Sequence, residues 1–528
     1  MNKKIQVWLP LLISIAVIAG MLIGYRLRDT QPGKRFFSFD KPRPLQEVMN
    51  LIQNKYVDEV KITALSDSAI IAVLHKLDPH SVFIPSEELQ GVNEDIAGNF
   101  FGVGIEFNIF EDTLHVLNVI PGGPSFKAGI KIGDKFIQVN DSVIAGKKIT
   151  TDQVRKLLRG DLGTKAVVQV VRKGNQQSFT IVRGVIPVSS VDASYIIGNG
   201  IGFIRLNKFS QVSYREFMQA LEDLQKKGLK KLILDLRGNG GGVLDEATAI
   251  ADEFLDGDKL ITYTLGNHMP KREYRCQREG LFEKGELVLL ADEGSASASE
   301  VLMGALQDWD RCTIIGRRSF GKGLVQEQYD LSDGSALRLT VARYYTPIGR
   351  SIQRSYTNGE KAYYEEINNR FRDGEVMSAD SVKNDTSKIF ATRNGKKVYG
   401  GGGITPDIFI PVDTTSYNAS LTKIYIKGTT SDFAYHYYLQ NAAQLSGYIS
   451  PGDFSKNFTV TDEIWKQFTI IAAKDSIVLT GLNEKDKKGL AARIKSALAR
   501  QIWRNEGFYE IMNEGDNTVK KAIEILSK

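Results

Sequence analysis

The sequence predicts a multidomain α/β protein, and three observations support that class. The chain of 528 residues is too long for one ordinary domain, so three or four domains are expected. Its 42% apolar and 25% charged residues are typical of globular proteins. After residue 187, strand-like and helix-like segments alternate, which predicts β-α-β units around a mainly parallel, buried sheet.

Residues 1–28 are predicted to form a transmembrane signal anchor. An uncharged, mostly apolar run from Ile5 to Tyr25 lies between basic residues and matches the roughly 30 Å hydrocarbon core of a bilayer. A cleaved signal peptide has a shorter apolar stretch and a small-residue cleavage site, and no clear A-x-A follows here. A buried core helix does not fit the terminal position and the basic flanks. We expect a cytoplasmic N-terminus, anchoring in the inner membrane and the bulk of the chain in the periplasm or otherwise outside the cytoplasm.

Residues 29–98 are expected to form a linker followed by helices. Residues 29–40 are polar, and apolar residues then recur at helical spacing over residues 44–78. The sequence LDPHS at 77–81 ends this part, because the residue before a proline is disfavoured in a helix.

Residues 99–186 are predicted to form a small mixed α/β domain. A glycine-bearing loop leads into a strand at 101–107, and Thr151 or Asp152 is expected to cap a helix. The expected strands cover 114–120, 135–141, 165–172 and 177–184, and the expected helices lie within 121–134 and 150–160.

Residues 187–412 are the predicted α/β core. A buried strand runs into the glycines of RGNGGG at 237–242, and the polar residues 355–396 are interpreted as an inserted loop. Residues 413–528 are expected to be a helical region, where apolar residues recur every four positions from Leu490 to Ile502. The other expected strands are 200–207, 285–292, 312–316 and 335–347, and the expected helices are 214–228, 245–255 and 299–309.

Charge and cysteine content argue against two classes of site. The net charge of +6 is small for this length and the basic residues form no long run, so no nucleic-acid partner is expected. Cys276 and Cys312 lack the spacing of a zinc site or a C-x-x-C motif. They are interpreted as ordinary core thiols, and a disulfide between them is left open.

Lys322 lies in G-x-x-x-x-G-K, which is most of a phosphate-binding loop. Such a loop needs Ser or Thr after the lysine and a helix after that. Here Gly323 follows the lysine, and the next residues alternate as in a strand. A nucleotide-binding protein that uses GRRSFGKG at 316–323 is therefore a disfavoured alternative.

Ser297 lies in DEGSASASE, residues 292–300, between a predicted buried strand and an amphipathic helix. Sites in α/β sheets form beyond the carboxyl ends of strands. A serine at a helix N-terminus also lies beside free backbone N–H groups that can stabilise an oxyanion. Ser297 and Glu300 also have the S-x-x-E spacing of a capping box, which is the simpler interpretation of this motif alone.

Other features favour chemistry at Ser297. Lys322 and the glycines at 237–242 should emerge at the same edge of the sheet, since each follows a core strand. The five histidines lie far from Ser297 in the sequence, in segments with no catalytic signature. A serine nucleophile needs a base, and serine–lysine pairs are a recognised variant of the triad. Burial beside Phe320 and Leu324 would lower the pKa of Lys322 from its usual value of about 10.4.

These motifs together resemble the carboxyl-terminal processing peptidases, or tail-specific proteases, which are PDZ-containing serine proteases with a Ser/Lys dyad. The resemblance covers roughly residues 40–412 and rests on GSASASE, FGKGLVQ, LDLRGNGGG, LDPHS and GITPD. It implies that Ser297 is the nucleophile, that Lys322 is the general base and that Gln326 orients the lysine. The implied oxyanion-hole donors are the N–H groups of Ala298 and of Gly241 or Gly242.

The resemblance also places a PDZ domain at 99–186. By it, the FGVG loop binds the carboxylate of a peptide C-terminus, and the peptide adds a strand beside VGIEF. An ordinary pair of turn glycines is the alternative for these four residues alone. Arg159 matches a position linked in relatives to sensing a bound tail. The implied peptide-binding residues are Phe101, Gly102, Val103, Gly104, Ile105 and Arg159.

Two features depart from the family pattern. Gly240 stands where the family usually has proline, which loosens the loop and leaves the choice between Gly241 and Gly242 open. About 50 residues separate Gln353 from Ile404, which lie almost together in many relatives. The insertion and the helical tail are candidates for gating, dimerisation or adaptor binding.

The apolar N-terminal run and the resemblance together imply a membrane-anchored serine endopeptidase that recognises the C-terminal tails of extracytoplasmic proteins. Apolar tails are the expected preference, because a PDZ groove is lined with apolar side chains. No metal, nucleotide or other cofactor is expected. The expected partners are protein or peptide substrates, the membrane, and a second copy of the chain or an adaptor protein. The alternative is a catalytically inactive PDZ scaffold, against which the intact Ser297, Lys322 and Gln326 argue.

Overall fold

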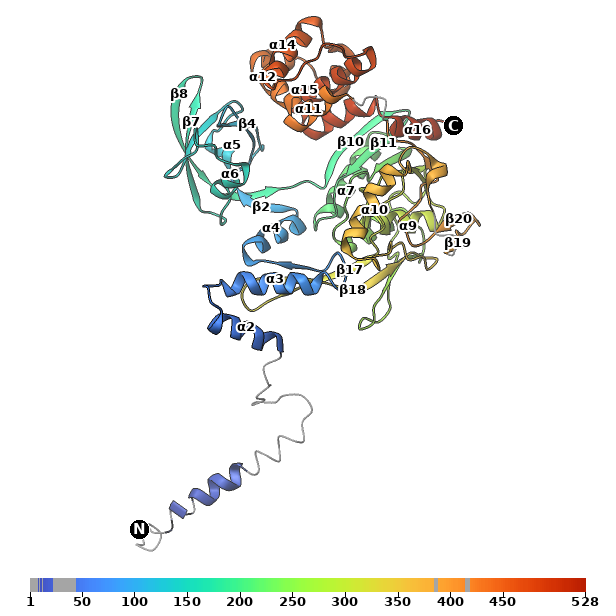
Figure 1. Cartoon of the computed structure of the whole chain (residues 1–528). Coiled ribbons are helices and arrows are strands. Elements are labelled where there is room, and N and C mark those ends of the chain that lie inside the picture. The colour runs from blue at the N-terminus through green and yellow to red at the C-terminus, as the bar shows by residue number, and fades with distance from the viewer. Residues whose placement is uncertain (1–7, 9, 12, 22–43, 384–387, 414–417) are drawn as a thin grey trace. The chain divides into compact units, whose positions relative to one another are not determined.

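The computed structural model describes residues 8, 10, 11, 13–21, 44–383, 388–413 and 418–528 (Figure 1). The chain divides into two compact units, Met1–Ala72 and Val73–Lys528. The predicted membrane anchor at 1–28 lies partly outside the described residues. Among the described ones, no helix is long and apolar enough to cross a membrane, so the predicted transmembrane helix is not found there.

The predicted N-terminal helices are present. Helix α2 (Pro44–Lys55) has no buried residue, and helix α3 (Ile62–Leu74) ends three residues before LDPHS begins. The chain then forms strand β1 (Val82–Ile84) and helix α4 (Ser86–Ala97), which the sequence pattern did not indicate.

The small mixed domain contains strands and two short helices, as predicted, and its strands pair antiparallel. Its strand order is β3-β4-β5-β7-β8, so β3 is an edge strand. Helix α6 begins one residue earlier than expected: the N-cap is Thr150, which exchanges hydrogen bonds with Gln153 in a capping box. The strands are β3 (Ile105–Phe110), β4 (Thr113–Val119), β5 (Lys135–Val139), β6 (Ser142–Val143), β7 (Lys165–Arg172) and β8 (Asn175–Val182), and the helices are α5 (Pro124–Ala128) and α6 (Thr151–Leu158).

A two-stranded ribbon joins this domain to its flanking segments. Strand β2 (Asn99–Gly102) pairs antiparallel with β9 (Gly184–Pro187). The ribbon brings the two ends of the small domain together, so the domain is inserted between α4 and the core.

The core is built on a six-stranded sheet in the order β10-β11-β12-β15-β16-β21. Only the β10–β11 pair is antiparallel; the other four pairs are parallel. The carboxyl ends of the parallel strands therefore meet at one edge. The strands are β10 (Val191–Gly198), β11 (Ile201–Leu206), β12 (Lys231–Asp235), β15 (Leu287–Ala291), β16 (Thr313–Gly316) and β21 (Ile408–Phe409).

The prediction of a mainly parallel core is wrong beyond this sheet. A second, five-stranded sheet is antiparallel throughout, and pairing over the described chain is mostly antiparallel. Its strands form hairpins and long returns instead of β-α-β units, so alternation of helices and strands did not reveal it. Besides β1 it holds β13 (Leu260–Leu265), β14 (Arg272–Arg275), β17 (Leu324–Asp330) and β18 (Ala336–Tyr345).

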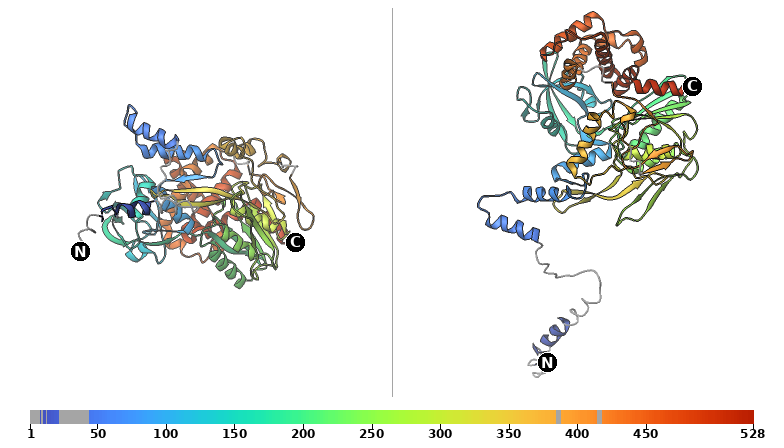
Figure 2. Two further views of the ribbon diagram at one scale, coloured as in Figure 1. Left: turned by 90° about the horizontal axis from the view of Figure 1, so that it is seen from below. Right: turned by 45° about the vertical axis from the view of Figure 1, so that its right-hand side comes forward.

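Helices cover both faces of the six-stranded sheet. On one face, side chains of α7 (Ser213–Lys226), α8 (Leu244–Asp252) and α9 (Ala298–Asp308) pack with the strands into the largest buried apolar cluster. The last helix, α16 (Asn517–Leu526), packs on the other face through buried residues such as Val519. Both views of Figure 2 show the C-terminus beside these strands. The end of the chain is thus part of the core's packing.

The insertion at 355–396 is expected to be a loop, but it contains regular structure. It contains helix α10 (Glu360–Arg372), a short 3-10 turn (Ala379–Ser381) and strand β19 (Ile389–Ala391), which pairs with β20 (Lys397–Tyr399). Its polar composition hid the helix, because its mean hydropathy is low and only Tyr363 and Arg370 are buried.

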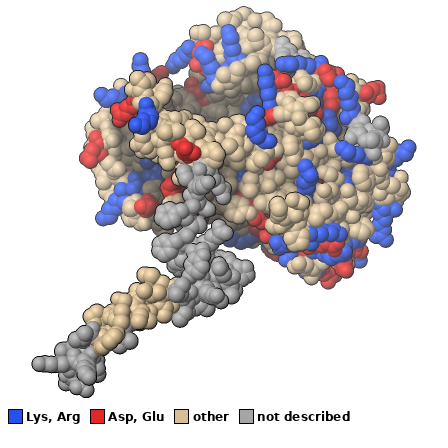
Figure 3. Space-filling model, turned by 60° about the horizontal axis from the view of Figure 1, so that its bottom comes forward, with Lys and Arg blue, Asp and Glu red and all other residues tan. Residues whose placement is uncertain are grey.

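The helical C-terminal region is confirmed. Leu490, Ile494 and Leu498 are fully buried in a separate apolar cluster formed by these helices. On the face shown in Figure 3, basic and acidic side chains are interspersed. Cys276 and Cys312 are free thiols. The helices are α11 (Ala419–Lys427), α12 (Thr429–Leu445), α13 (Pro451–Asn457), α14 (Asp462–Lys474) and α15 (Glu484–Asn513).

Candidate active site

Three loops meet at the carboxyl edge of the six-stranded sheet. They follow the neighbouring strands β12, β15 and β16, whose ends are in register. The first carries the glycines of 237–242, the second carries Ser297 and the third carries Lys322. The structure thus brings together at one edge the segments that the sequence pattern assigned there.

Ser297 lies at the N-terminus of α9 in an unusual backbone conformation. Its φ is 56° and its ψ is −115°, a combination that costs a non-glycine residue free energy. The glycine loop presses against it: a Cβ on Gly241 would lie 2.7 Å from both the Ala296 oxygen and the Ser297 Cβ. Only glycine fits there, so Gly241 fixes the backbone of the loop directly beside the serine.

Asn239 holds this glycine loop to the serine segment. It is fully buried, its side-chain nitrogen donates to the Leu206 carbonyl at 2.9 Å, and its own carbonyl accepts the Ala296 N–H and the Ser299 hydroxyl, both at 2.9 Å. Sequence reasoning missed this residue, since an asparagine among glycines reads as a turn residue.

Glu300 links the serine segment to the lysine loop. Its fully buried carboxylate accepts the N–H of Ser297 at 2.9 Å, of Gly321 at 2.7 Å and of Lys322 at 2.8 Å, and the Ser319 hydroxyl at 2.5 Å. Burial raises the pKa of Glu300, and these donated hydrogen bonds oppose the rise. Glu300 therefore accepts the N–H of the N-cap residue Ser297, as in a capping box, and also positions the loop of Lys322.

Tyr344, on β18, joins the same two segments from the other side. Its hydroxyl lies 3.0 Å from the Ser297 carbonyl oxygen and also hydrogen-bonds the Lys322 carbonyl. Burial raises the pKa of this hydroxyl well above its usual value, so it stays protonated as a donor. The backbones of Ser297 and Lys322 therefore share two anchoring side chains.

The Lys322 side chain is partly buried and hydrogen-bonds Gln326. Its Nζ donates to Gln326 Oε1 at 3.1 Å, and the Gln326 amide nitrogen donates to the His80 carbonyl. Burial lowers the pKa of Lys322, and nearby Arg338 lowers it further, whereas Glu300 and Asp78 oppose this. The lysine is followed by strand β17 and not by a helix, which is the arrangement expected if no Walker-type loop is present.

His80, which is far from Ser297 in the sequence, contacts the side chain that binds Lys322. Its carbonyl accepts from Gln326, and its ring nitrogen lies 2.8 Å from the Tyr363 hydroxyl. Burial first, and then Lys322, lower its pKa to about 4, so the imidazole is neutral at pH 7. Asp78 fixes this segment by accepting the N–H groups of His80 and Ser81 at 2.8 and 2.9 Å. A long sequence separation concealed this contact.

The two glycines proposed for the oxyanion hole differ in geometry. The Gly241 N–H donates to Asn239 Oδ1 at 2.9 Å and is therefore already bonded. The Gly242 N–H points away from Phe209, because Phe209 bonds to the residues on either side of Gly242. Ala298 is the first residue of α9, so its N–H has no acceptor within the helix.

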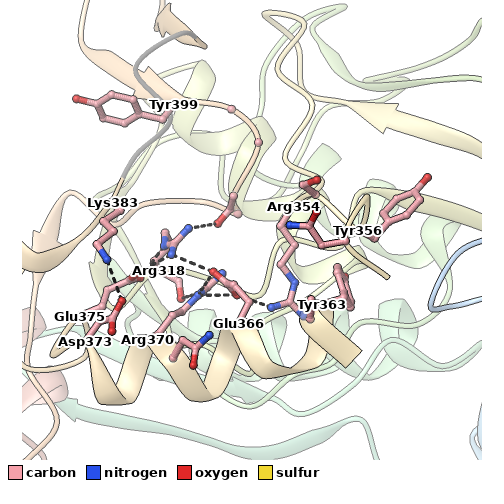
Figure 4. Close-up of a pocket in the computed structure, with 18 of the residues that line it drawn as sticks. Arg318, Arg354, Tyr356, Tyr363, Glu366, Arg370, Asp373, Glu375, Lys383 and Tyr399 are labelled. Atoms are coloured by element: carbon pink, nitrogen blue, oxygen red, sulfur yellow. Dashed lines mark hydrogen bonds and ion pairs between the residues drawn. The ribbon is translucent and has the colours of Figure 1, made fainter. Parts of the chain in front are cut away.

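The insertion supplies side chains that hold the segment before Lys322, among them Tyr363 and Arg370, which Figure 4 labels. Arg370 donates to the carbonyl oxygens of Ser319 at 2.7 Å and Phe320 at 3.3 Å. The Arg354 guanidinium lies over both the Phe320 and the Tyr363 rings, 4.0 and 3.9 Å from their centres. A pocket of about 430 Å³ opens beside these side chains. The insertion therefore holds the loop on which Lys322 lies.

The predicted peptide-binding residues are partly gathered at a groove on the small domain. Gly102, Val103, Gly104, Ile105 and Arg159 line it, beside β3 and α6. Phe101 does not line it: this residue pairs with Val185 in the ribbon, and its neighbour Phe100 faces the groove instead. Arg159 forms an ion pair with Glu94 at 2.9 Å and lies over the Phe100 ring.

The chain matches models of known families in three regions. These are peptidase family S41 over residues 200–359, the PDZ domain over residues 102–182, and a family of unknown function over residues 420–504. The first region contains Ser297 and Lys322, the second contains the groove, and the third lies in the helical C-terminal region.

Individual proteins are similar over most of their length. A carboxy-terminal-processing protease of Bartonella bacilliformis is 34% identical over 313 residues, which are 58% of this chain and 71% of that protein. The carboxy-terminal processing protease CtpA of Bacillus subtilis is 31% identical over 365 residues, 67% of this chain and 76% of that protein. A solved photosystem II D1 C-terminal processing protease is 27% identical and covers 70% of this chain and 86% of its own, with a TM-score of 0.36.

The family matches include the segments that carry Ser297 and Lys322 and the domain that carries the groove. The chain therefore belongs to peptidase family S41, as a PDZ-containing serine protease of the carboxyl-terminal processing type.

Proposed function

We propose that this protease cleaves peptide bonds with Ser297 as nucleophile and Lys322 as general base. The Ser297 hydroxyl attacks the scissile carbonyl, and neutral Lys322 takes its proton. The amine product leaves after it is protonated by the lysine. Water then attacks the acyl-enzyme while Lys322 takes a proton from it, and the lysine returns that proton to Ser297 as the acid product leaves. Gln326 and the surrounding protein keep the lysine in place between these steps.

The oxyanion hole of this proposal uses the N–H groups of Ala298 and Gly242. The Gly241 N–H is already bonded to Asn239, whereas the Gly242 N–H is directed away from its strand partner. The positive end of the α9 dipole adds to the stabilisation of the oxyanion. Gly241 contributes by its small size, since it lets the loop approach Ser297.

The proposed substrates are proteins with apolar C-terminal tails, bound in the groove of the PDZ domain. The edge strand β3 has no strand partner on its groove side in the described sheet, so a peptide can add a strand there. Apolar side chains such as Val103 and Leu158 line the groove. The apolar run between Ile5 and Tyr25 supports action outside the cytoplasm, which cell fractionation would test.

One observation carries the proposal: burial lowers the pKa of Lys322 while Glu300 and Tyr344 fasten its backbone and that of Ser297 to common partners. To test it, the full-length chain would be incubated, without added ATP or metal, with a loosely folded reporter that has an apolar tail. Wild type should degrade the reporter, and Lys322→Ala and Ser297→Ala should not.

Lys226→Ala is the matched control, because Lys226 is an exposed lysine on α7. It should cleave like wild type. Equal cleavage by Lys322→Ala and wild type would exclude the dyad. No cleavage by any protein, with the tail still bound, would favour the inactive scaffold.

A further inference from the structure

The helical C-terminal region packs against the PDZ domain through aromatic side chains. Tyr435 on α12 is fully buried and stacks on Phe110 of β3, with ring centres 5.6 Å apart. The His115 ring of β4 meets Tyr435 edge-on at 5.7 Å. Buried apolar contact of this kind fixes the two parts together more firmly than surface charges alone.

Helix α15 then brings two arginines to the groove strand. Arg504 interrupts the helix with a φ of 60° and a ψ of −145°. Its guanidinium hydrogen-bonds Glu106 of β3, and the Arg500 Nη2 lies 3.4 Å from the other oxygen of the same carboxylate. The next residue, Asn505, accepts from the Arg500 Nε at 3.3 Å and donates to Asp192 of the core at 2.7 Å. The strained kink thus positions both arginines over β3.

The charge of the groove is mostly positive. The charged side chains that line it are Arg155, Arg159, Arg500 and Glu106. Arg155 and Arg159 pair with Asp152 and Glu94 outside the lining. Glu106 is shared by two arginines, Arg500 and Arg504, so one positive charge is in excess on that side. The Arg500 side chain is 41% exposed, and both contacts described above are long, so it can bind a further carboxylate.

Strand geometry decides which residue of a bound tail would meet Arg500. Ile105 and Phe107 pack against the core of the PDZ domain, so Glu106 between them faces the opposite side of β3. A tail added beside β3 alternates in the same way. If its apolar terminal residue faces the core side, its penultimate residue lies on the side of Glu106 and the two arginines.

We propose that Arg500 is a specificity-determining residue of the PDZ groove and selects tails with an acidic penultimate residue. The inference rests on the proposed recognition of tails by this groove. It gives the helical C-terminal region, which belongs to a family of unknown function, a role in reading the substrate. The groove is incomplete without that region, because the PDZ domain supplies Glu106 but not the arginine that reads the tail.

The test uses fluorescein-labelled decapeptides of Gly and Ser that end in Leu-Xaa-Val, where Xaa is Glu, Gln or Lys. Binding to the full-length chain carrying Ser297→Ala, which prevents cleavage, would be followed by fluorescence anisotropy. The Glu peptide should bind about three- to tenfold more tightly than the Gln peptide, and the Lys peptide most weakly. The preference should fall with added salt. Moving Glu one position inward should abolish its advantage.

Variants of α15 separate the proposal from a general charge effect. Arg500→Gln should bind the Glu and Gln peptides equally, Arg500→Lys should keep part of the preference, and Arg500→Glu should favour the Lys peptide. Arg493→Gln removes the same charge from the same helix, outside the groove lining, and should keep the wild-type order. Equal affinity of wild type for the Glu and Lys peptides would overturn the role of Arg500 but leave the recognition of tails by the groove intact. Binding of no peptide would overturn the PDZ recognition on which it rests.

Discussion

Replacing Glu300 by glutamine should damage both stability and catalysis, since this carboxylate accepts four hydrogen bonds without donating any. Its Oε2 accepts the N–H groups of Ser297 and Lys322, and its Oε1 accepts from Gly321 and the Ser319 hydroxyl. A glutamine must place its NH₂ group against one of these pairs. If the NH₂ group faces Ser297 and Lys322, both of their backbone N–H groups lose their acceptor. If it faces Gly321 and Ser319, only the Gly321 N–H is left without an acceptor, because the Ser319 hydroxyl can rotate.

The orientation of the glutamine in Glu300→Gln that leaves fewer N–H groups unpaired determines the expected loss in the free energy of unfolding. One buried N–H without an acceptor costs about 1–3 kcal/mol, and two cost about 2–6 kcal/mol. The free energy of unfolding should therefore fall by about 1–3 kcal/mol, with Gly321 unpaired. Loss of the negative charge should also lower the pKa of Lys322 further, because Glu300 opposes its depression.

Two assays measure these effects of Glu300→Gln. Urea denaturation gives the stability loss, and the pH profile of kcat/KM should show its acid limb displaced to lower pH, with a reduced plateau. Glu524→Gln, at an exposed acid on α16, is the control and should change neither. Wild-type stability together with an unshifted acid limb would refute the role assigned to Glu300.

Further predictions concern the neighbouring residues. Gln326→Ala should lower kcat/KM about tenfold, because it removes the 3.1 Å acceptor of Lys322; an unchanged rate would contradict this. Gly241→Ala should cost about 100-fold in kcat, since its Cβ would displace Ser297, and a crystal structure would locate the shift. Arg370→Ala should lower the free energy of unfolding by about 1–3 kcal/mol in denaturant titrations, because the buried Ser319 carbonyl loses the donor that it accepts from. In wild type, kcat/KM should rise with pH up to a pKa below 10.5, as Lys322 loses its proton, and a flat profile would argue against a lysine base.

The sequence was informative where one local rule decides the structure. Strands that end in glycine-rich or serine-rich loops predicted that Ser297, Lys322 and the 237–242 glycines share a sheet edge, and the three loops do follow neighbouring parallel strands. Helical periodicity likewise located the buried residues of α15. In these cases the pattern depends on the segment itself and on one general rule of sheet geometry.

Contacts between distant segments were beyond such reasoning. His80 reaches Gln326 across 246 residues, and Tyr344 reaches Ser297 across 47. The antiparallel second sheet is likewise made by strands from separate parts of the chain, and the polar helix α10 is held by buried arginines instead of an apolar face. Each of these features depends on contacts with residues far away in the sequence, which a local sequence pattern cannot predict. The same holds for Arg500 and Glu106, which lie 394 positions apart.

The most direct test of the central claim is to trap the acyl-enzyme and find which residue carries it. Full-length chain would be mixed with a p-nitrophenyl ester of a blocked apolar amino acid, quenched in acid, digested and analysed by mass spectrometry. The account predicts an acyl group on the peptide that contains Ser297, formed more slowly as the pH falls, and absent from Ser297→Ala and Lys322→Ala. An acyl group on another residue, or the same rate of acylation of Ser297 in Lys322→Ala, would contradict it.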